Sequence, residues 1–168
     1  MLMAWLLVLM VTQQASRAPD IHFTPTRHNG ADALLRLANV GPADVVYDLG
    51  SGDGRIPIIA AQEYGARGVG IEIDPALIAT AKQIAAEAEV GHRVSFITGD
   101  LFEADLRKAT VVTAYLSTTI MKRLEPTLRS LPPGTRIVSH QFTIPGWAPT
   151  RTVKVDESEL LLWIVPGR

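Results

Sequence analysis

The chain has 168 residues, of which 47% are hydrophobic and 20% charged, and this length suits one domain with its own core. Its formal net charge of −1 argues against a general nucleic-acid binder, which would carry an excess of basic residues. Cysteine is absent, which excludes disulfides, a thiolate metal site and a thiol nucleophile. The 4 histidines show no paired spacing, so the sequence predicts no metal site.

Residues 1–20 form an apolar N-terminal segment, in which the first basic residue is Arg17. Its continuous apolar run, residues 1–11, is shorter than the roughly 20 residues of a membrane-spanning helix, and it lacks the basic start of a secretory signal. Three interpretations stay open: a weak secretory signal, an uncleaved interfacial anchor, and a helix packed on the domain. They correspond to secretion, a membrane-associated protein and a cytoplasmic protein.

Residues 21–168 are expected to form a single domain, in which strand and helix patterns alternate. In chain order, the expected elements are an extended lead-in at 23–26, a helix at 31–40, a strand at 45–49, a helix at 55–64, a strand at 67–73, a helix from 75 to about 90, strands at 93–98 and 109–116, a helix that begins at 117–119, a strand at 135–140, and strands at 151–155 and 159–165. Pro126 is expected to break or kink the last of these helices.

This alternation predicts an α/β fold with a Rossmann-like, doubly wound sheet in a three-layer α/β/α arrangement. The sheet is expected to be mostly parallel, and the last two strands to form an antiparallel hairpin at the C-terminal end. Ligands of such sheets bind at the carboxyl ends of the strands. Those ends hold Asp48, Glu72, Asp100, Tyr115 and His140.

Three glycines at alternate positions, Gly50, Gly52 and Gly54, follow the strand at 45–49, and the next strand ends in Glu72. A strand, a glycine turn, a helix and a second strand tipped with an acid make a nucleotide-binding half-fold. The glycines let the backbone approach a ligand closely, and the acid can accept hydrogen bonds from ribose hydroxyls. The spacing departs from G-x-G-x-x-G, so an NAD-dependent dehydrogenase is only a minor alternative.

The motifs at 48–55 (DLGSGDGR), 70–74 (GIEID), 99–102 (GDLF) and 23–26 (FTPT) resemble those of the class I, seven-strand S-adenosylmethionine-dependent methyltransferases. The chain is most similar to the small protein-lysine methyltransferase branch, which includes the ATP-synthase c-subunit lysine methyltransferases. The resemblance implies S-adenosylmethionine as cofactor, S-adenosylhomocysteine as product and methyl transfer to a protein lysine. The alternatives are a small-molecule methyltransferase and a non-catalytic module that binds the cofactor.

The resemblance also implies which residues bind the methionine and ribose parts of the cofactor. Gly50, Ser51 and Gly52 would pass under the methionine half, and Asp48 would hold its amino group. Glu72 would accept hydrogen bonds from both ribose hydroxyls, with Ile73 beside it in the cofactor-binding set.

At the other end of the cofactor, Asp100 would accept a hydrogen bond from the adenine amino group and Leu101 would pack on the ring. Phe23 and Thr26 match the family's aromatic-x-Pro-Thr lead-in, which folds over the cofactor. Phe23 stands where tyrosine is usual, so a hydroxyl contact is lost there.

Tyr115 is the candidate catalytic residue, because a phenol at a strand end can orient an amine by a hydrogen bond or a cation–π contact. The sequence at this position is Ala114-Tyr115-Leu116-Ser117 and not the Asn-Pro-Pro-Tyr of nucleobase and glutamine methylation, so no nucleic-acid partner is expected. No inserted lid follows the strand at 135–140. An open rim suits a protein substrate with an accessible lysine, in a membrane or free. His140 is expected to be structural, with a chemical role as the weaker alternative.

Overall fold

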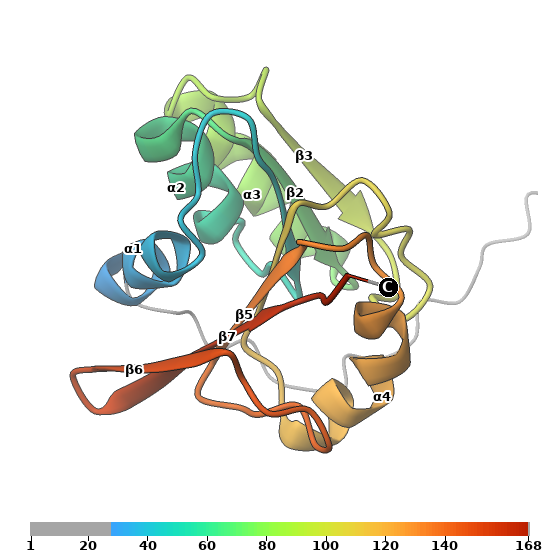
Figure 1. The fold of residues 1–168 in the computed structure, drawn as a ribbon. Helices are drawn as coiled ribbons and strands as arrows, with labels where there is room; N and C mark the ends of the chain where they lie inside the picture. Colours follow the sequence, from blue (N-terminus) through green and yellow to red (C-terminus); the bar gives the residue numbers. More distant parts are fainter. Residues whose placement is uncertain (1–27, 168) are drawn as a thin grey trace, which may run out of the picture.

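The structure is a computed structural model that describes residues 28–167, and in it seven strands form one mixed sheet (Figure 1). Residues 1–20, Phe23 and Thr26 lie outside the described residues. The strand order is β3-β2-β1-β4-β5-β7-β6. The strands are β1 (Val45–Leu49), β2 (Arg67–Glu72), β3 (Val94–Thr98), β4 (Val111–Ala114), β5 (Arg136–His140), β6 (Arg151–Val155) and β7 (Ser158–Ile164).

Pairing in the sheet is parallel from β3 to β5, and antiparallel between β5 and β7 and between β7 and β6. The doubly wound sheet and its C-terminal antiparallel hairpin are therefore confirmed. The hairpin turns at Asp156 and Glu157, one residue tighter than the sequence predicts.

The helices are α1 (His28–Leu37), α2 (Arg55–Tyr64), α3 (Pro75–Glu87) and α4 (Thr118–Arg129). Apolar side chains of α1 and α2 pack with those of β1, β4, β5 and β7 on one face of the sheet, and α3 packs beside α2 over β3. On the opposite face, α4 contributes Met121, Leu124 and Leu128 to the core around Trp163. The three-layer α/β/α arrangement is confirmed (Figure 1).

Helix starts and ends follow the sequence signals closely. The Asp74 carboxylate caps α3 by accepting a hydrogen bond from the Ala76 N–H at 2.8 Å, and Pro75 occupies the first turn. Gly65 ends α2 with a φ of 66°, a conformation that glycine adopts without a steric cost. The helix expected at 31–40 begins three residues earlier and ends at Leu37.

Of the break or kink expected at Pro126, the break is wrong, because α4 continues through that residue to Arg129. Proline has no N–H, so the carbonyl of Lys122 loses its helical partner. Lys122 lies at an exposed position of α4. Ser117 is the N-cap residue of α4, as expected, but its side chain makes no capping hydrogen bond.

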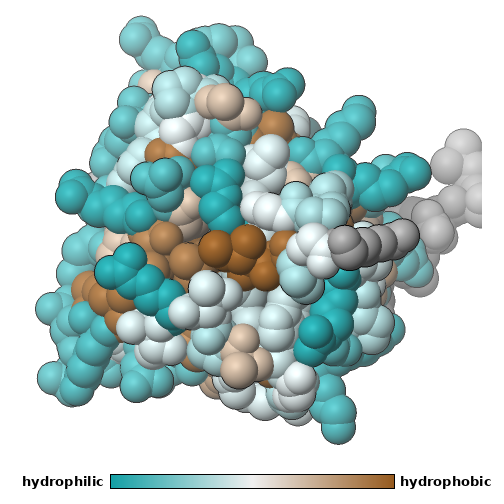
Figure 2. Space-filling view, in the orientation of Figure 1, coloured by the Kyte–Doolittle hydropathy of each residue, from teal (hydrophilic) through white to brown (hydrophobic). Residues whose placement is uncertain are grey.

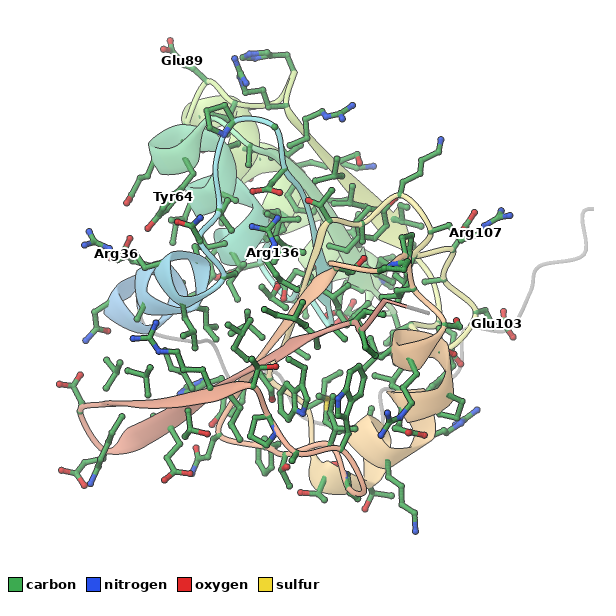
Figure 3. The ribbon with its side chains drawn as sticks, viewed as in Figure 1. Arg36, Tyr64, Glu89, Glu103, Arg107 and Arg136 are labelled. Carbon is green, nitrogen blue, oxygen red and sulfur yellow. The ribbon has the colours of Figure 1, made fainter. Side chains whose placement is uncertain are left out.

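Two polar networks tie helix α1 and the loop after it to the domain (Figure 3). Arg136 of β5 pairs with Asp44 and donates to the carbonyl oxygens of Ala38 and Asn39 at 2.9 and 3.0 Å. The Tyr64 hydroxyl donates to the Asp32 carboxylate, so α2 is also joined to α1. These contacts hold α1 and the loop after it against α2 and β5.

Candidate functional site

The turn after β1 is a tight loop in which three glycines have positive φ. These angles are 73° at Gly50, 53° at Gly52 and 77° at Gly54, a region that residues with a Cβ rarely adopt. The N–H groups of Gly50 and Ser51 both donate to the Ile71 carbonyl, at 2.9 and 3.0 Å. The loop is thus fastened to the end of β2, where the sequence predicts a ligand.

Glu72 lies beneath this turn, and its carboxylate holds the turn in place. Its Oε2 accepts from the Gly52 N–H at 2.9 Å, and its Oε1 accepts from the N–H groups of Ile73 and Asp74 at 2.8 and 3.0 Å. A carboxylate offers about four lone-pair positions, so three backbone donors leave about one for a ligand. Binding both ribose hydroxyls through Glu72 would require one backbone bond to open.

Asp48, the residue at the carboxyl end of β1, is almost fully buried, with 4% of its surface exposed. Its Oδ1 accepts a hydrogen bond from the Thr113 hydroxyl at 2.7 Å. Burial, with a smaller contribution from the charges of Glu72 and Asp53, raises the pKa of Asp48 to about 7. A cationic amino group next to this carboxyl would favour its ionised form.

Gly70 of β2 packs directly under the turn, a role that the sequence analysis missed. A Cβ at this position would lie 2.5 Å from the Ser51 Oγ and 2.7 Å from the Phe96 ring. The Ser51 Oγ is itself buried and has no hydrogen-bond partner among the described residues. Two glycines in a buried strand, Gly68 and Gly70, were the available signal for this close approach.

At the neighbouring strand end, Asp100 and Leu101 follow β3. The Gly99 N–H donates to the Glu72 carbonyl at 2.9 Å, which brings this loop next to the ribose candidate. The Asp100 Oδ1 accepts from the Phe102 N–H at 3.0 Å, so Asp100 also shapes its own turn. Leu101 is half-buried against the α4 side of the core.

Three rings meet at the carboxyl ends of β4 and β5. The Tyr115 and His140 ring centroids are 4.2 Å apart, and those of Tyr115 and Phe142 are 5.7 Å apart. We call Tyr115, His140 and Phe142 the aromatic group. The register pairs Leu49 with Ala114 and Ala114 with Ser139. Each of these residues is followed in the chain by a residue of the site. Tyr115 therefore lies between the glycine turn, which begins at Gly50, and His140.

The backbone that presents His140 and Phe142 is strained. Gln141 between them has a φ of 70°, and the Phe142 N–H donates to the His140 carbonyl at 2.9 Å. This is a three-residue γ-turn in the left-handed region, which costs a non-glycine residue on the order of 1–3 kcal/mol. Such strain persists only where the surrounding structure imposes it, and it is concentrated at functional sites.

The structure therefore joins the glycine turn and Glu72 by a hydrogen bond, with Asp48 in the adjacent strand β1 bonded to Thr113, and with Asp100 and Leu101 following β3. Tyr115 lies on the other side of the turn, in the aromatic group. Within residues 28–167, no cluster of three or more His, Asp or Glu side chains could hold a metal ion. Thr113 and Phe142 are the other site residues that the sequence did not single out, whereas His140 was placed at this edge of the sheet and expected to be structural.

Comparison with known proteins assigns the family. Residues 48–151 match the family described as the ANTKMT methyltransferase domain. The chain belongs to this family. It is an S-adenosylmethionine-dependent methyltransferase, which confirms the resemblance, the cofactor and the reaction class inferred from the sequence.

The family relatives include a protein-lysine N-methyltransferase of Saccharolobus islandicus, 40% identical over 86% of this chain and 91% of its own length. The mouse adenine nucleotide translocase lysine N-methyltransferase is 37% identical over 80% of this chain. The match spans only 58% of that mouse protein.

A solved structure described as an RNA methyltransferase from Salinibacter ruber, in complex with S-adenosyl-L-homocysteine, is 51% identical to the chain. The alignment has a TM-score of 0.85 and covers 86% of this chain and 95% of that one.

The described residues fit the cofactor of this family. Gly50 and Gly52 leave the backbone of the turn without a Cβ, so a ligand can approach it there, whereas Gly54 packs against Phe96 and Ala81. The buried Asp48 carboxyl suits a cationic amino group, and Glu72 keeps an acceptor position for a hydroxyl. When bound, S-adenosylmethionine supplies an activated methyl group on a positively charged sulfur.

Proposed function

We propose that this methyltransferase transfers the methyl group to a lysine side chain of a protein. The aromatic group is the observation that carries this proposal. It lies beside the glycine turn, where an acceptor would meet the methyl group, and ring faces attract an ammonium group. The relatives named as lysine methyltransferases support the same substrate class.

We assign the cofactor contacts as the sequence predicts, with one refinement. Asp48 holds the amino group, Gly50 to Gly52 lie under the methionine part, and Asp100 and Leu101 bind the adenine. Glu72 binds one ribose hydroxyl and keeps the turn closed with its backbone hydrogen bonds. Phe23 and Thr26 cover the cofactor in this proposal, although both lie outside the described residues.

For this methyl transfer, the main task of the protein is to align the amine nitrogen with the methyl carbon. Holding the amine nitrogen about 3–3.5 Å from the methyl carbon and in line with its bond to sulfur can lower the barrier by roughly 7–11 kcal/mol. Only the neutral amine attacks, and neutralising a lysine with a pKa of about 10.4 costs roughly 4–5 kcal/mol at pH 7. The positive sulfur and an apolar surrounding both favour the neutral amine.

RNA is the second candidate substrate, because the Salinibacter ruber structure is described as an RNA methyltransferase. Two features of this chain favour protein over RNA. Its net charge is −1, and Ala114-Tyr115-Leu116-Ser117 replaces the motif that holds a nucleobase amine. The substrate assay must therefore separate the two classes.

Membrane association is a further part of the proposal. The described residues contain no helix long and apolar enough to cross a membrane. An apolar segment at residues 1–20 would instead hold the domain at a membrane surface and near membrane-embedded substrates. Comparing methyl transfer to soluble and membrane fractions addresses this point.

The test uses radiolabelled S-adenosylmethionine, the full chain, and cell lysate separated into soluble and membrane fractions. We expect label that protease removes and ribonuclease does not, with more of it in the membrane fraction. Glu72→Gln is the control, because it weakens the acceptor and the hydrogen bonds that close the turn. We expect at least about a tenfold loss of cofactor affinity in this variant, measured by calorimetry. Label that only ribonuclease removes would overturn the lysine proposal.

A further inference from the structure

Within the aromatic group, His140 has features that packing alone does not explain. Its Nδ1 atom is buried and has no hydrogen-bond partner among residues 28–167. Buried polar atoms in proteins are almost always paired, so such an atom calls for an explanation. The strained γ-turn at Gln141 fixes the ring against Tyr115, 4.2 Å away between centroids.

The charge state of His140 suits the acceptance of a proton. Burial lowers the pKa of the ring below its ordinary value of 6.5, so the ring is neutral at pH 7. Burial is the only cause resolved for this lowering, and no charged side chain contributes to it. The Tyr115 ring, just after β4, contacts the His140 ring, and the register partner of His140 on β7 is Leu160, which the exposed Glu159 precedes.

We propose that His140 is the proton acceptor for the substrate ammonium, and that Tyr115 and Phe142 hold that ammonium against their rings. This inference rests on the proposed lysine substrate and names the residues that bind and deprotonate it. Because the Nδ1 atom of His140 is buried, the side chains that cover it must move aside for an ammonium group to donate the hydrogen bond that this atom lacks. His140 is then a catalytic residue in a position that the sequence analysis regarded as structural.

The step balances in protons and electrons. The ammonium N–H gives its proton to the His140 ring, which becomes an imidazolium, and the amine is left with a free lone pair. That lone pair forms the new nitrogen–carbon bond while the carbon–sulfur bond breaks, and the bonding electrons stay on sulfur. The positive charge passes from sulfur to the methylated amine, and the imidazolium returns its proton to water.

Imidazole is a weaker base than a free lysine amine, so this transfer needs a depressed lysine pKa. The positive sulfur next to the amine and the partly buried rings around it both lower that pKa toward the imidazole range. The His140 ring, kept neutral at pH 7 by its lowered pKa, is then available to accept the proton.

The experiment measures kcat against pH for wild type, His140→Asn and the control His92→Asn, with a lysine-containing substrate protein. His92 is exposed and precedes β3, at the opposite ends of the strands from the aromatic group. We expect wild type and His92→Asn to reach a plateau above the His140 pKa. His140→Asn should be about 100-fold slower at pH 7 and gain about tenfold per pH unit, because only free neutral amine then reacts.

Affinity for S-adenosylhomocysteine, measured by calorimetry, separates chemistry from folding. It should be unchanged in His140→Asn, and Phe142→Leu should raise KM for the substrate about tenfold with a smaller change in kcat. A pH profile of His140→Asn that runs parallel to wild type would overturn the inference and leave the lysine substrate intact. Loss of S-adenosylhomocysteine binding would also overturn it, since His140 would then be structural. A wild type that leaves lysine unmethylated refutes the proposed function itself.

Discussion

At the scale of single residues, Asp48 connects the stability of this domain to its function. Its carboxyl is buried at the end of β1 with the Thr113 hydroxyl as a hydrogen-bond donor, and burial raises its pKa from 3.8 to about 7. Between these two pH values the folded protein keeps a proton that the unfolded chain has released. The free energy of unfolding therefore falls as the pH rises from about 4 to about 7, by up to about 4 kcal/mol, and stays low above that.

Asp48→Asn should reverse this effect, because an amide cannot ionise. In thermal unfolding without cofactor, we expect the variant to gain stability over wild type at pH 8 and to show little difference at pH 4. Its affinity for S-adenosylmethionine should fall about 10–100-fold, the value of a charge-assisted hydrogen bond. Glu103→Gln, at an exposed carboxylate, is the control and should change neither quantity. Equal unfolding temperatures of wild type and Asp48→Asn at pH 8 would contradict this account.

The sequence predicts much at this scale but not the hydrogen-bonding of Glu72. The strand-end acids and the three glycines are local patterns, so they could be read directly. That Glu72 uses three backbone donors depends on how the turn folds back over β2, which no local pattern specifies. The position of His140 at a strand end was predicted, but its ring contact with Tyr115 and the position of Phe142 were not, since strand pairing and the γ-turn at Gln141 place their rings.

At the scale of elements, the closest fit in the site is between the glycine turn and β2. Gly68 and Gly70 face α2 and the turn, where a Cβ at either position would lie 2.5–2.7 Å from neighbouring atoms. The helices and strands themselves were predictable from periodicity, with boundaries displaced by a few residues. Pro126 does not end α4, because it removes one helical hydrogen bond and the helix continues for only one further turn, to Arg129.

Gly70→Ala tests the fit between β2 and the turn. The added methyl group would meet the Ser51 Oγ at 2.5 Å, so the turn must move or the protein loses stability. We expect a loss of about 1–3 kcal/mol in the free energy of unfolding by urea titration, together with weaker cofactor binding. Gly91→Ala is matched to it, because a Cβ there has no neighbour within 4 Å. An unfolding midpoint of Gly70→Ala equal to that of Gly91→Ala would show that the turn is not packed as described.

At the scale of the whole molecule, the two halves of the sheet carry different parts of the candidate site. The ends of β1, β2 and β3 carry the cofactor candidates, and the ends of β4 and β5 carry the aromatic group. Helix α1 covers the β5 and β7 half on one face, where a band of apolar side chains follows β7 toward the C-terminal end (Figure 2). Ile164 of β7 is 43% exposed on this strand. The order of the elements in the sequence predicts the fold class and the placement of site residues at the strand ends. It does not predict the identity of the methyl acceptor.

The central claim is that the methyl group goes to a lysine of a protein. The most direct measurement is tandem mass spectrometry of protein and RNA recovered from one lysate after reaction with isotopically labelled S-adenosylmethionine and the full chain. We predict labelled methyl groups on lysine side-chain nitrogens, absent when Glu72→Gln replaces wild type at limiting cofactor. Label confined to nucleotides, with none on lysine, would contradict the account.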